Sequence, residues 1–480
     1  MTLTRRPTLP RAAGLTPLAL ALALGFAASA AQAQSLKELY DAARGYDATY
    51  LSARALADSA QYRADQAGAL RLPTVGLQAT SNYVDTKTSA SSVTTVPTPL
   101  GPQESRSQSD TESKVATNQV VLSAQQTLFN KSNSATIEQA ERGVAVAQSQ
   151  LRNAEQDLIV RVAQAYFDVL GAMDTLTTVQ ASKKAISEQL ASAKRNFEVG
   201  TATITDTREA QARYDLSLAQ ELAADNDLRI KRLALDQLVG RANATPRSLA
   251  LPVALPAVAP ANVDDWVSGA ETRSPAIQQA QLALEIARLE TEKARAGHLP
   301  TLTLGANYAK TYPNGSADTN SASTTQGPAF INSRNGNTST ASIGLTLNVP
   351  LFAGFSIQNR IKETLSLEEK SRNDLDGARR AVTQGTRTAF YGVQSGQAQV
   401  KALEAAESST KLALEATQLG YKVGVRVNLD VLNAQTQLFT TQRDLAKARY
   451  DVIVNGLKLR QVSGQLQPED LQATDALLAP

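Results

Sequence analysis

Residues 197–206 read Phe-Glu-Val-Gly-Thr-Ala-Thr-Ile-Thr-Asp, and residues 421–430 read Tyr-Lys-Val-Gly-Val-Arg-Val-Asn-Leu-Asp. The two stretches lie 224 positions apart and share a Val-Gly pair and a closing aspartate. The same spacing separates Gly240 from Gly464. Upstream, the Leu-Pro-Thr of residues 72–74 recurs at residues 299–301. One structural unit is therefore used twice along nearly the whole chain.

The repeat sets the expected domain organisation. We expect a signal peptide over residues 1–33, a first repeat over 34–240, a Pro-rich linker over 241–261, a second repeat over 262–464 and a C-terminal tail over 465–480.

The first 33 residues have the three parts of a secretory signal. Three arginines precede an apolar run from Leu15 to Ala28, and Ala31-Gln32-Ala33 supplies the small residues of a cleavage site. The adjacent Arg5 and Arg6 leave a twin-arginine signal as an alternative, although the neighbouring prolines fit it poorly. The chain has no cysteine, so the exported protein has no disulfide, no thiolate metal site and no cysteine that could accept a lipid.

Composition narrows the class of protein. After Ala33 no apolar run reaches the roughly 18 residues that a transmembrane helix needs, so any membrane residence has to use strands. The net charge is only +3 on 480 residues, which argues against a nucleic-acid partner held by phosphate neutralisation. The aromatic content of 5% is low and alanine is abundant, as in long close-packed helices.

Alternating sequence predicts four strands, two in each repeat. The clearest is residues 342–351, where Ile, Leu and Val alternate with small or polar residues. Residues 301–308 follow the same period, and residues 74–83 and 120–124 are their counterparts in the first repeat. A period of two suits a strand with one lipid face and one wet face. The polar segments between the paired strands, residues 84–114 and 310–340, are predicted to be surface loops.

Long helices follow the strands. Residues 132–199 contain no proline, and apolar residues recur every seven positions at Ile137, Val144, Leu151, Leu158 and Ala165. Such a heptad seam predicts coiled-coil packing. We expect a return helix over 205–239 and an equivalent pair over 356–423 and 429–462. An ordinary coiled-coil scaffold would share this pattern, but it would not explain the export signal and the strands.

Four strands cannot close a barrel by themselves. An open sheet edge in hydrocarbon would leave N–H and C=O groups unsatisfied at several kcal/mol each, so copies of the chain have to share one barrel. Two copies give eight strands, whose interior is filled by side chains, whereas three copies give twelve and begin to leave a lumen. A trimer is the smallest assembly that fits transport.

The chain resembles the TolC family of outer-membrane channel proteins from about residue 35 to 464. The most specific piece is residues 420–434, Gly-Tyr-Lys-Val-Gly-Val-Arg-Val-Asn-Leu-Asp-Val-Leu-Asn-Ala, with its partner at 199–206. Supporting pieces are residues 165–170 and 349–354. The resemblance implies a mainly α protein with a membrane β-barrel. In that family a trimer shares a twelve-stranded barrel in the outer membrane and builds a helical coiled-coil tunnel in the periplasm.

The resemblance also assigns residues. A latch that holds the periplasmic end closed would join Asp206 of the first repeat to Tyr421 and Arg426 of the second, and three copies of Asp430 would form an acidic ring at the entrance. The family's best-known pattern has a second acid at the place of Asn433, so a double acidic ring is in doubt. Two other interpretations remain open: helix capping by the two aspartates, and simple packing by Tyr421.

The predicted function is the exit duct of a tripartite efflux pump or of a type I secretion system. The implied partners are two further copies of the chain, a periplasmic adaptor, an inner-membrane pump and outer-membrane lipid. An enzyme is not expected, since His298 is the only histidine and no phosphate loop or metal-spaced carboxylate set appears; we expect no cofactor and no metal. The alternative is a periplasmic coiled-coil adaptor or scaffold.

Overall fold

The structure, a computed structural model, describes residues 33–250, 252–253, 255–323, 330–333 and 336–479. The predicted signal peptide lies outside the described residues except for Ala33. The described chain forms two compact units. The helical unit comprises the described parts of Met1–Ala57, Gln148–Ala280 and Leu375–Pro480, and the strand unit comprises those of Asp58–Ala147 and Gln281–Asp374. Each unit takes segments from both repeats.

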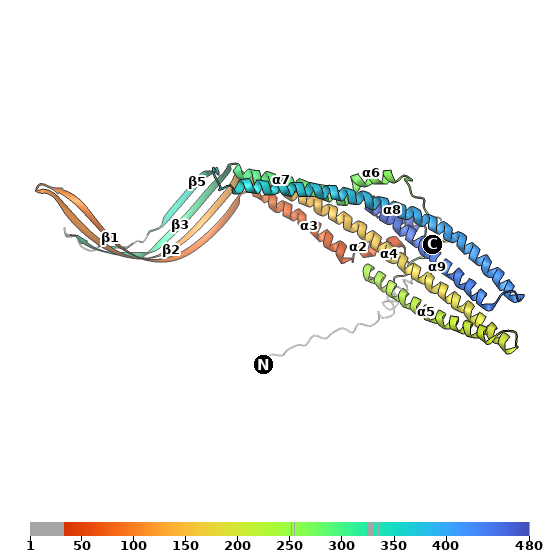
Figure 1. Cartoon of the computed structure of the whole chain (residues 1–480). Helices are drawn as coiled ribbons and strands as arrows, with labels where there is room; N and C mark the ends of the chain where they lie inside the picture. The colour runs from red at the N-terminus through yellow and green to blue at the C-terminus, as the bar shows by residue number, and fades with distance from the viewer. Residues whose placement is uncertain (1–32, 251, 254, 324–329, 334–335, 480) are drawn as a thin grey trace, which may run out of the picture. The chain divides into compact units, whose positions relative to one another are not determined.

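The order of elements is the same in the two repeats (Figure 1). Each has two helices, an antiparallel strand pair, one very long helix and a return helix, which confirms the predicted internal repeat. The first repeat contains α2 (Leu36–Arg44), α3 (Ala48–Gly68), the short turn η1 (Ala69–Arg71), β1 (Thr74–Thr98), β2 (Gly101–Phe129), α4 (Lys131–Glu198) and α5 (Ile204–Val239). The second contains α6 (Val263–Arg273), α7 (Pro275–Arg295), η2 (Ala296–His298), β3 (Thr301–Ser323), β4 (Phe330–Ser333), β5 (Thr338–Asn348), α8 (Ser356–Lys422) and α9 (Asn428–Val462), and α10 (Asp470–Asp475) follows it.

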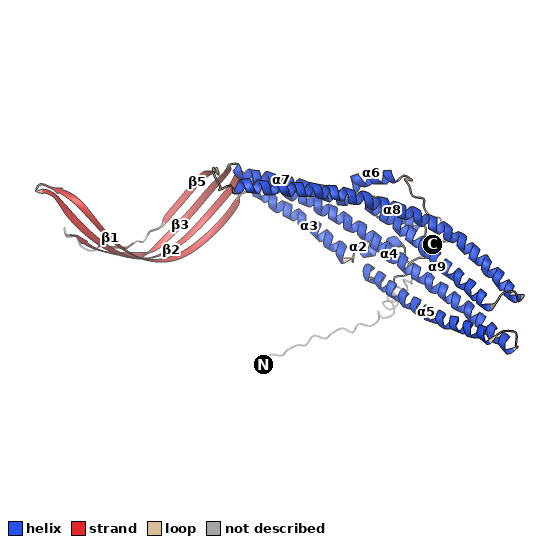
Figure 2. Cartoon of the chain, in the orientation of Figure 1, coloured by secondary structure: helices blue, strands red, loops and turns tan. Residues whose placement is uncertain are grey.

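The strands form one antiparallel sheet in the strand unit (Figure 2). β1 pairs with β2, β2 with β3, and β3 with both β4 and β5. β5 pairs with residues 301–311 of β3 and β4 pairs with residues 316–319, so these two strands follow one another along the same edge. The described sheet therefore has four strand positions, as predicted.

The prediction of a loop over residues 84–114 is wrong, because these residues belong to β1 and β2. β1 and β2 continue through it as a ladder to the tip, pairing Ser89 with Asp110, Ser92 with Ser107 and Thr98 with Gly101. Polar residues on both faces remove the alternation that marks a half-buried strand, yet the backbone of each strand still finds its partner. In the second predicted loop, residues 310–323 also belong to a strand, β3; residues 324–329 and 334–335 lie outside the described residues.

The helical unit contains two hairpins, made by α5 with α4 from residue 148 onward and by α9 with α8 from residue 375 onward. α4 has 68 residues and α8 has 67, and all four helices end within about two residues of the predicted positions. α4 alone corresponds to about 100 Å at 1.5 Å per residue. The turns of the two hairpins are built alike: Gly200 and Gly424 both have φ of 82°, a value that favours glycine, and their N–H groups bond to the carbonyls of Phe197 and Tyr421 at 3.0 and 3.1 Å.

The main apolar core of the helical unit joins both repeats with the two ends of the described chain. Leu158 and Tyr166 of α4 pack there with Leu235 of α5 and Leu457 of α9, all less than a tenth exposed. Of the predicted heptad positions, Leu158 is fully buried in this core, and Leu151 and Ala165 pack against it.

The C-terminal segment completes this core. Leu471 is fully buried, and the carboxylate of Asp475 accepts the backbone N–H groups of Leu36 and Lys37 at 2.8 and 3.2 Å, at the start of α2. The segment after Gly464 thus folds onto the helical unit, while the domain boundaries given above stay a prediction.

Candidate functional site

The predicted site residues lie at the turn ends of the two hairpins in the helical unit. Asp206 follows the turn between α4 and α5, whereas Tyr421, Arg426 and Asp430 border the turn between α8 and α9. Both turns begin with Val-Gly, so differences between their other side chains show what each hairpin does with the same backbone.

In the first turn Asp206 completes a capping box. Thr203 is the N-cap of α5, and its hydroxyl accepts the N–H of Asp206 at 3.2 Å. In return the Asp206 carboxylate accepts the Thr203 N–H at 3.0 Å and its hydroxyl at 2.7 Å. A box of this kind satisfies backbone donors that the first helical turn otherwise leaves free. Asp206 thus fixes the start of α5 from the third helical position.

The second turn lacks this box. Val427 stands at the N-cap of α9 and has no hydroxyl, so no side chain caps the helix. The Asp430 carboxylate instead lies 3.6 Å from the guanidinium of Arg426, with the two side chains 37% and 62% exposed. Such an exposed pair contributes roughly 0.2 to 1 kcal/mol.

Gly420 makes room for Arg426. A Cβ at this position would lie 2.8 Å from the Cγ of Arg426, closer than two carbon atoms can approach without a shift. The equivalent residue of the first hairpin is Asn196, 224 positions earlier. The second hairpin therefore lets its arginine fold back over α8.

Tyr421 is bonded to the first repeat. The side-chain amide of Asn196 on α4 donates to its phenolic oxygen at 3.3 Å. Among the described residues the structure brings Tyr421 to Asn196, Arg426 to Asp430 and Asp206 to Thr203, and it gives no bond from Asp206 to Tyr421 or Arg426. The latch assignment stays a prediction.

Two further bonds at this end cross between the repeats, and neither was predicted from the sequence. Gln189 of α4 donates to Asn428 of α9, and Arg213 of α5 donates to Asn433 of α9 at 2.9 Å. A buried apolar cluster lies between these helices, made of Ile186, Leu190, Ala193, Ala210 and Leu432. Arg213 lies seven residues after Asp206, a heptad spacing that would have placed both on one face of α5.

A partly buried polar pair joins α4 to α9 farther from the turns. The hydroxyl of Tyr450 donates to the Asp174 carboxylate at 2.5 Å. Burial raises the pKa of Asp174, and the hydrogen bond from Tyr450 opposes that rise. Burial also raises the pKa of Tyr450, followed by its bond to Asp174. The pair links α4 to α9 beside the apolar core, to which Tyr450 belongs.

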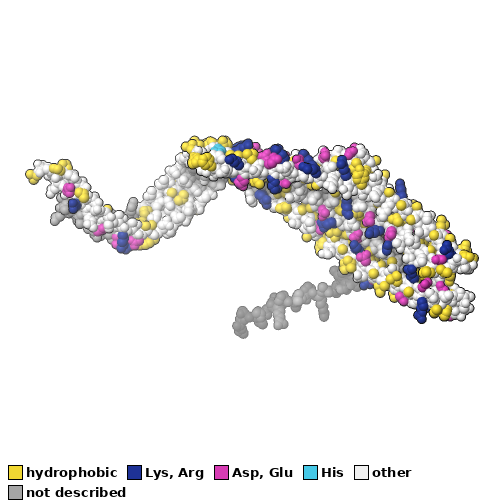
Figure 3. All heavy atoms as spheres, viewed as in Figure 1, with side chains coloured by type: hydrophobic (Ala, Val, Ile, Leu, Met, Phe, Trp, Pro, Cys, Tyr) yellow, Lys and Arg dark blue, Asp and Glu magenta, His cyan; other side chains and the backbone are white. Residues whose placement is uncertain are grey.

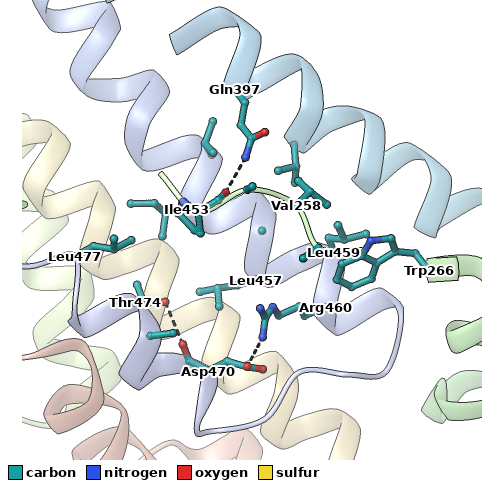
Figure 4. A pocket seen from close by; sticks show the side chains of 17 residues that line it. Val258, Trp266, Gln397, Ile453, Leu457, Leu459, Arg460, Asp470, Thr474 and Leu477 are labelled. Atoms are coloured by element: carbon teal, nitrogen blue, oxygen red, sulfur yellow. Dashed lines mark hydrogen bonds and ion pairs between the residues drawn. The ribbon is translucent and has the colours of Figure 1, made fainter. Parts of the chain in front are cut away.

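A small cavity of about 170 Å³ lies in the helical unit beside the Pro-rich segment (Figure 4). Ile453, Leu457 and Leu459 of α9 line it together with Trp266 of α6. Gln397 donates to the Pro256 carbonyl at 2.9 Å along one side, and Arg460 pairs with Asp470 at the opposite side. The cavity lies between segments that already hold each other by bonds, so it is a packing feature of the linker.

The described residues contain no group of three or more His, Cys, Asp or Glu side chains placed to hold a metal ion. Within the same residues, no helix combines the length and the apolar character needed to cross a membrane.

Comparison with known proteins identifies the family. The family model described as "Outer membrane efflux protein" matches residues 39–241 and 266–465, one match for each repeat. The chain belongs to the outer membrane efflux protein family. Two matches of similar length agree with the duplicated order of elements in this efflux protein.

Individual relatives agree. The chain is 31% identical to the outer membrane protein TolC of Vibrio cholerae over 96% of this chain and 98% of that protein. It is 32% identical to the alkaline protease secretion protein AprF of Pseudomonas aeruginosa over 74% of this chain and 71% of that protein. Among solved structures, the CmeC outer membrane channel of Campylobacter jejuni shares the fold with a TM-score of 0.71 over 99% of both chains at 14% identity.

These findings confirm the predicted TolC family and the mainly helical fold with four strands per chain. This efflux protein is an outer-membrane channel for efflux or secretion. Channels of this family are non-enzymatic transport conduits.

Proposed function

We propose that three copies of the chain pool their strands into one twelve-stranded barrel in the outer membrane. The observation that carries the proposal is the open sheet. β1 lies at one edge, and β4 and β5 at the other, of a sheet with four strand positions among the described residues. In hydrocarbon both edges need partners for their N–H and C=O groups, and a neighbouring copy offers the complementary edge.

The side chains of the strands support a lipid contact. On β5, Ile343, Leu345 and Leu347 are all more than 60% exposed in the single chain and alternate with small or polar residues. Hydrophobic side chains also gather where strands meet helices in the strand unit (Figure 3), where Leu351, Phe352 and Phe355 are exposed. An outward apolar band edged by aromatic residues is the pattern of transmembrane strands.

In the same proposal the long helices form a periplasmic tunnel whose inner end is held closed by polar contacts. Asp206, Tyr421 and Arg426 serve as the latch, and three copies of Asp430 form the entrance ring. The single-chain contacts support weak, openable closure: Tyr421 has one neutral bond to Asn196 and Arg426 one exposed ion pair. These are worth roughly 0.5 to 1.5 and 0.2 to 1 kcal/mol. Their sum over three copies is within reach of a partner's binding energy.

The partners that supply this energy are a periplasmic adaptor and an inner-membrane pump. The relatives include an outer membrane efflux protein and a protease secretion protein, so both cargo classes fit a channel of this family. In our proposal the pump selects the cargo and the channel gives it an exit.

Fractionation together with conductance tests the function. We expect the full chain to separate with outer membranes, to run as a heat-stable trimer on a denaturing gel and to form discrete channels in planar bilayers. The competing adaptor function predicts a monomer in the inner-membrane fraction that gives no channels.

A further inference from the structure

Arg213 and Asn433 bind one another across the two repeats. The guanidinium of Arg213, on α5, donates from Nη2 to the side-chain carbonyl oxygen of Asn433, on α9, at 2.9 Å. α5 is the return helix of the first hairpin and α9 that of the second. The bond therefore connects the two return helices near the turn ends.

Buried neighbours hold both partners in place. Ala210 lies one helical turn before Arg213 and is fully buried, and Leu432 directly precedes Asn433 and is also fully buried. Both belong to the apolar cluster between α4, α5 and α9. Residues three apart on a helix share a face, so burial of Ala210 directs Arg213 toward α9. The bond from Arg213 to Asn433 therefore lies next to the packed apolar cluster.

Ion pairs of these helices differ from this bond in what they connect. Lys183 with Glu221 joins α4 to α5 inside the first hairpin, and Arg449 with Glu404 joins α8 to α9 inside the second. Because both residues of such a pair lie in the same hairpin, the pair stays intact when one hairpin moves relative to the other. The bond from Arg213 to Asn433 has one end on each hairpin, so it breaks whenever the return helices separate.

We propose that Arg213 is a positioning residue of the resting channel, which holds α5 against α9 through Asn433 and must release it on opening. The proposal rests on the proposed function, because it assigns a closing contact to the same channel end. It adds a contact outside the latch residues named above. The neutral amide of Asn433 makes this contact weaker than a charge pair would be, since bonds between two ionised groups are stronger.

Single-channel conductance of the full chain in planar bilayers tests the proposal. Arg213→Ala and Asn433→Ala should each raise the conductance several-fold by the same factor, and the double variant should add nothing, because all three lose one and the same bond. Asn433→Asp should lower the conductance at low salt by turning the bond into an ion pair, and roughly 1 M salt should remove that decrease by screening. If Arg213 had a purely structural role, Asn433→Asp would not lower the conductance in a salt-dependent way.

Arg229→Ala is the matched control. Arg229 lies on the same helix and pairs with Asp225 of α5 at 2.7 Å, so its loss breaks no bond between the repeats. We expect parental conductance from this variant. Parental conductance from Arg213→Ala, or an additive effect of the double variant, would overturn the proposal.

Cross-linking distinguishes failure of the proposed contact between Arg213 and Asn433 from failure of the proposed channel function. The chain has no cysteine, so Arg213→Cys with Asn433→Cys creates the only thiol pair. We expect a short bismaleimide to join the two within one chain and to prevent opening. If neither the parent nor any variant conducts, the proposed function fails, and the cross-link alone decides the contact; the absence of the cross-link in folded protein would overturn it.

Discussion

Asn196 donates to the phenolic oxygen of Tyr421 at 3.3 Å, and the duplicated structure has no symmetric copy of this bond. The repeat places Gly420 at the position of Asn196, and Phe197 at the position of Tyr421. The first hairpin therefore supplies the donor and the second the acceptor. Although the backbone is duplicated, this bond forms in one direction only, so the two hairpins make different polar contacts at their turns.

Removing the polar groups of the second turn should open the channel. We expect Tyr421→Phe combined with Arg426→Ala to raise the single-channel conductance several-fold, because the bond from Asn196 and the pair with Asp430 are both lost. The control is Tyr391→Phe, which removes the same atom from an exposed tyrosine of α8. Folded channels with parental conductance would count against the latch.

Gly420→Ala should act through Arg426 alone. The new methyl group would meet the Cγ of Arg426 at 2.8 Å, so the arginine has to move away from its present position. We expect higher conductance with little loss of thermal stability. Gly392→Ala on the same helix adds a methyl group that meets nothing within 4 Å and should only favour the helix, by about 0.5 to 1 kcal/mol. Equal conductance of the two variants would exclude this positioning by Gly420.

Asp430→Ala should weaken the preference for cations. Arg426 neutralises part of the carboxylate at 3.6 Å, and Asn433 replaces a second acid, so we expect a modest shift of the reversal potential in a salt gradient. Asp225→Ala, which removes an acid paired with Arg229 within α5, serves as the control. An unaltered reversal potential for Asp430→Ala would remove this residue from the entrance ring.

Acid should weaken the contact between Asp47 and Arg161 in the helical unit. The carboxylate receives two guanidinium bonds, at 2.8 and 3.0 Å, and the N–H of Tyr50 at 2.8 Å. The bonds from Arg161, chiefly, hold the pKa of Asp47 below its usual range, while burial opposes them. Because the folded pKa lies below the unfolded value of about 3.9, the stabilisation is present above about pH 4 and is lost as the pH falls through the folded pKa.

The measurement is thermal unfolding of the parent and of Asp47→Asn at several pH values. We expect the variant to be less stable at pH 7 by about 1 to 2 kcal/mol, a value reduced because Arg161 is one-third exposed, and the difference to shrink near pH 3. Asp157→Asn, which removes a more exposed partner of the same arginine, should cost less. A difference that does not change with pH would contradict this account.

The sequence predicts the helices well and the strand lengths poorly, for a physical reason. Helix ends carry local signals, such as Gly200 and Gly424, whose positive φ ends each long helix. The outer halves of β1 and β2 carry Ser, Thr and charged residues on both faces, as at Ser92 and Ser107, so no apolar alternation marks them. What makes them strands is pairing across the hairpin, which no single segment encodes.

The site was predictable only in part. The two turns differ at Tyr421 and Arg426, whose counterparts are Phe197 and Ala202, whereas Asp206 is matched by Asp430 and was assigned by the family resemblance alone. The capping box of Asp206 follows from Thr203 three residues earlier, but the partners Asn196 and Arg213 depend on which helix faces which. That is a property of packing between the repeats, set by buried residues such as Leu432.

The number of chains in the purified, detergent-solubilised protein tests the account most directly, by light scattering with the detergent mass subtracted. Our account predicts three, because each open sheet edge needs a neighbour. A stable, folded particle that contains a single chain would contradict it.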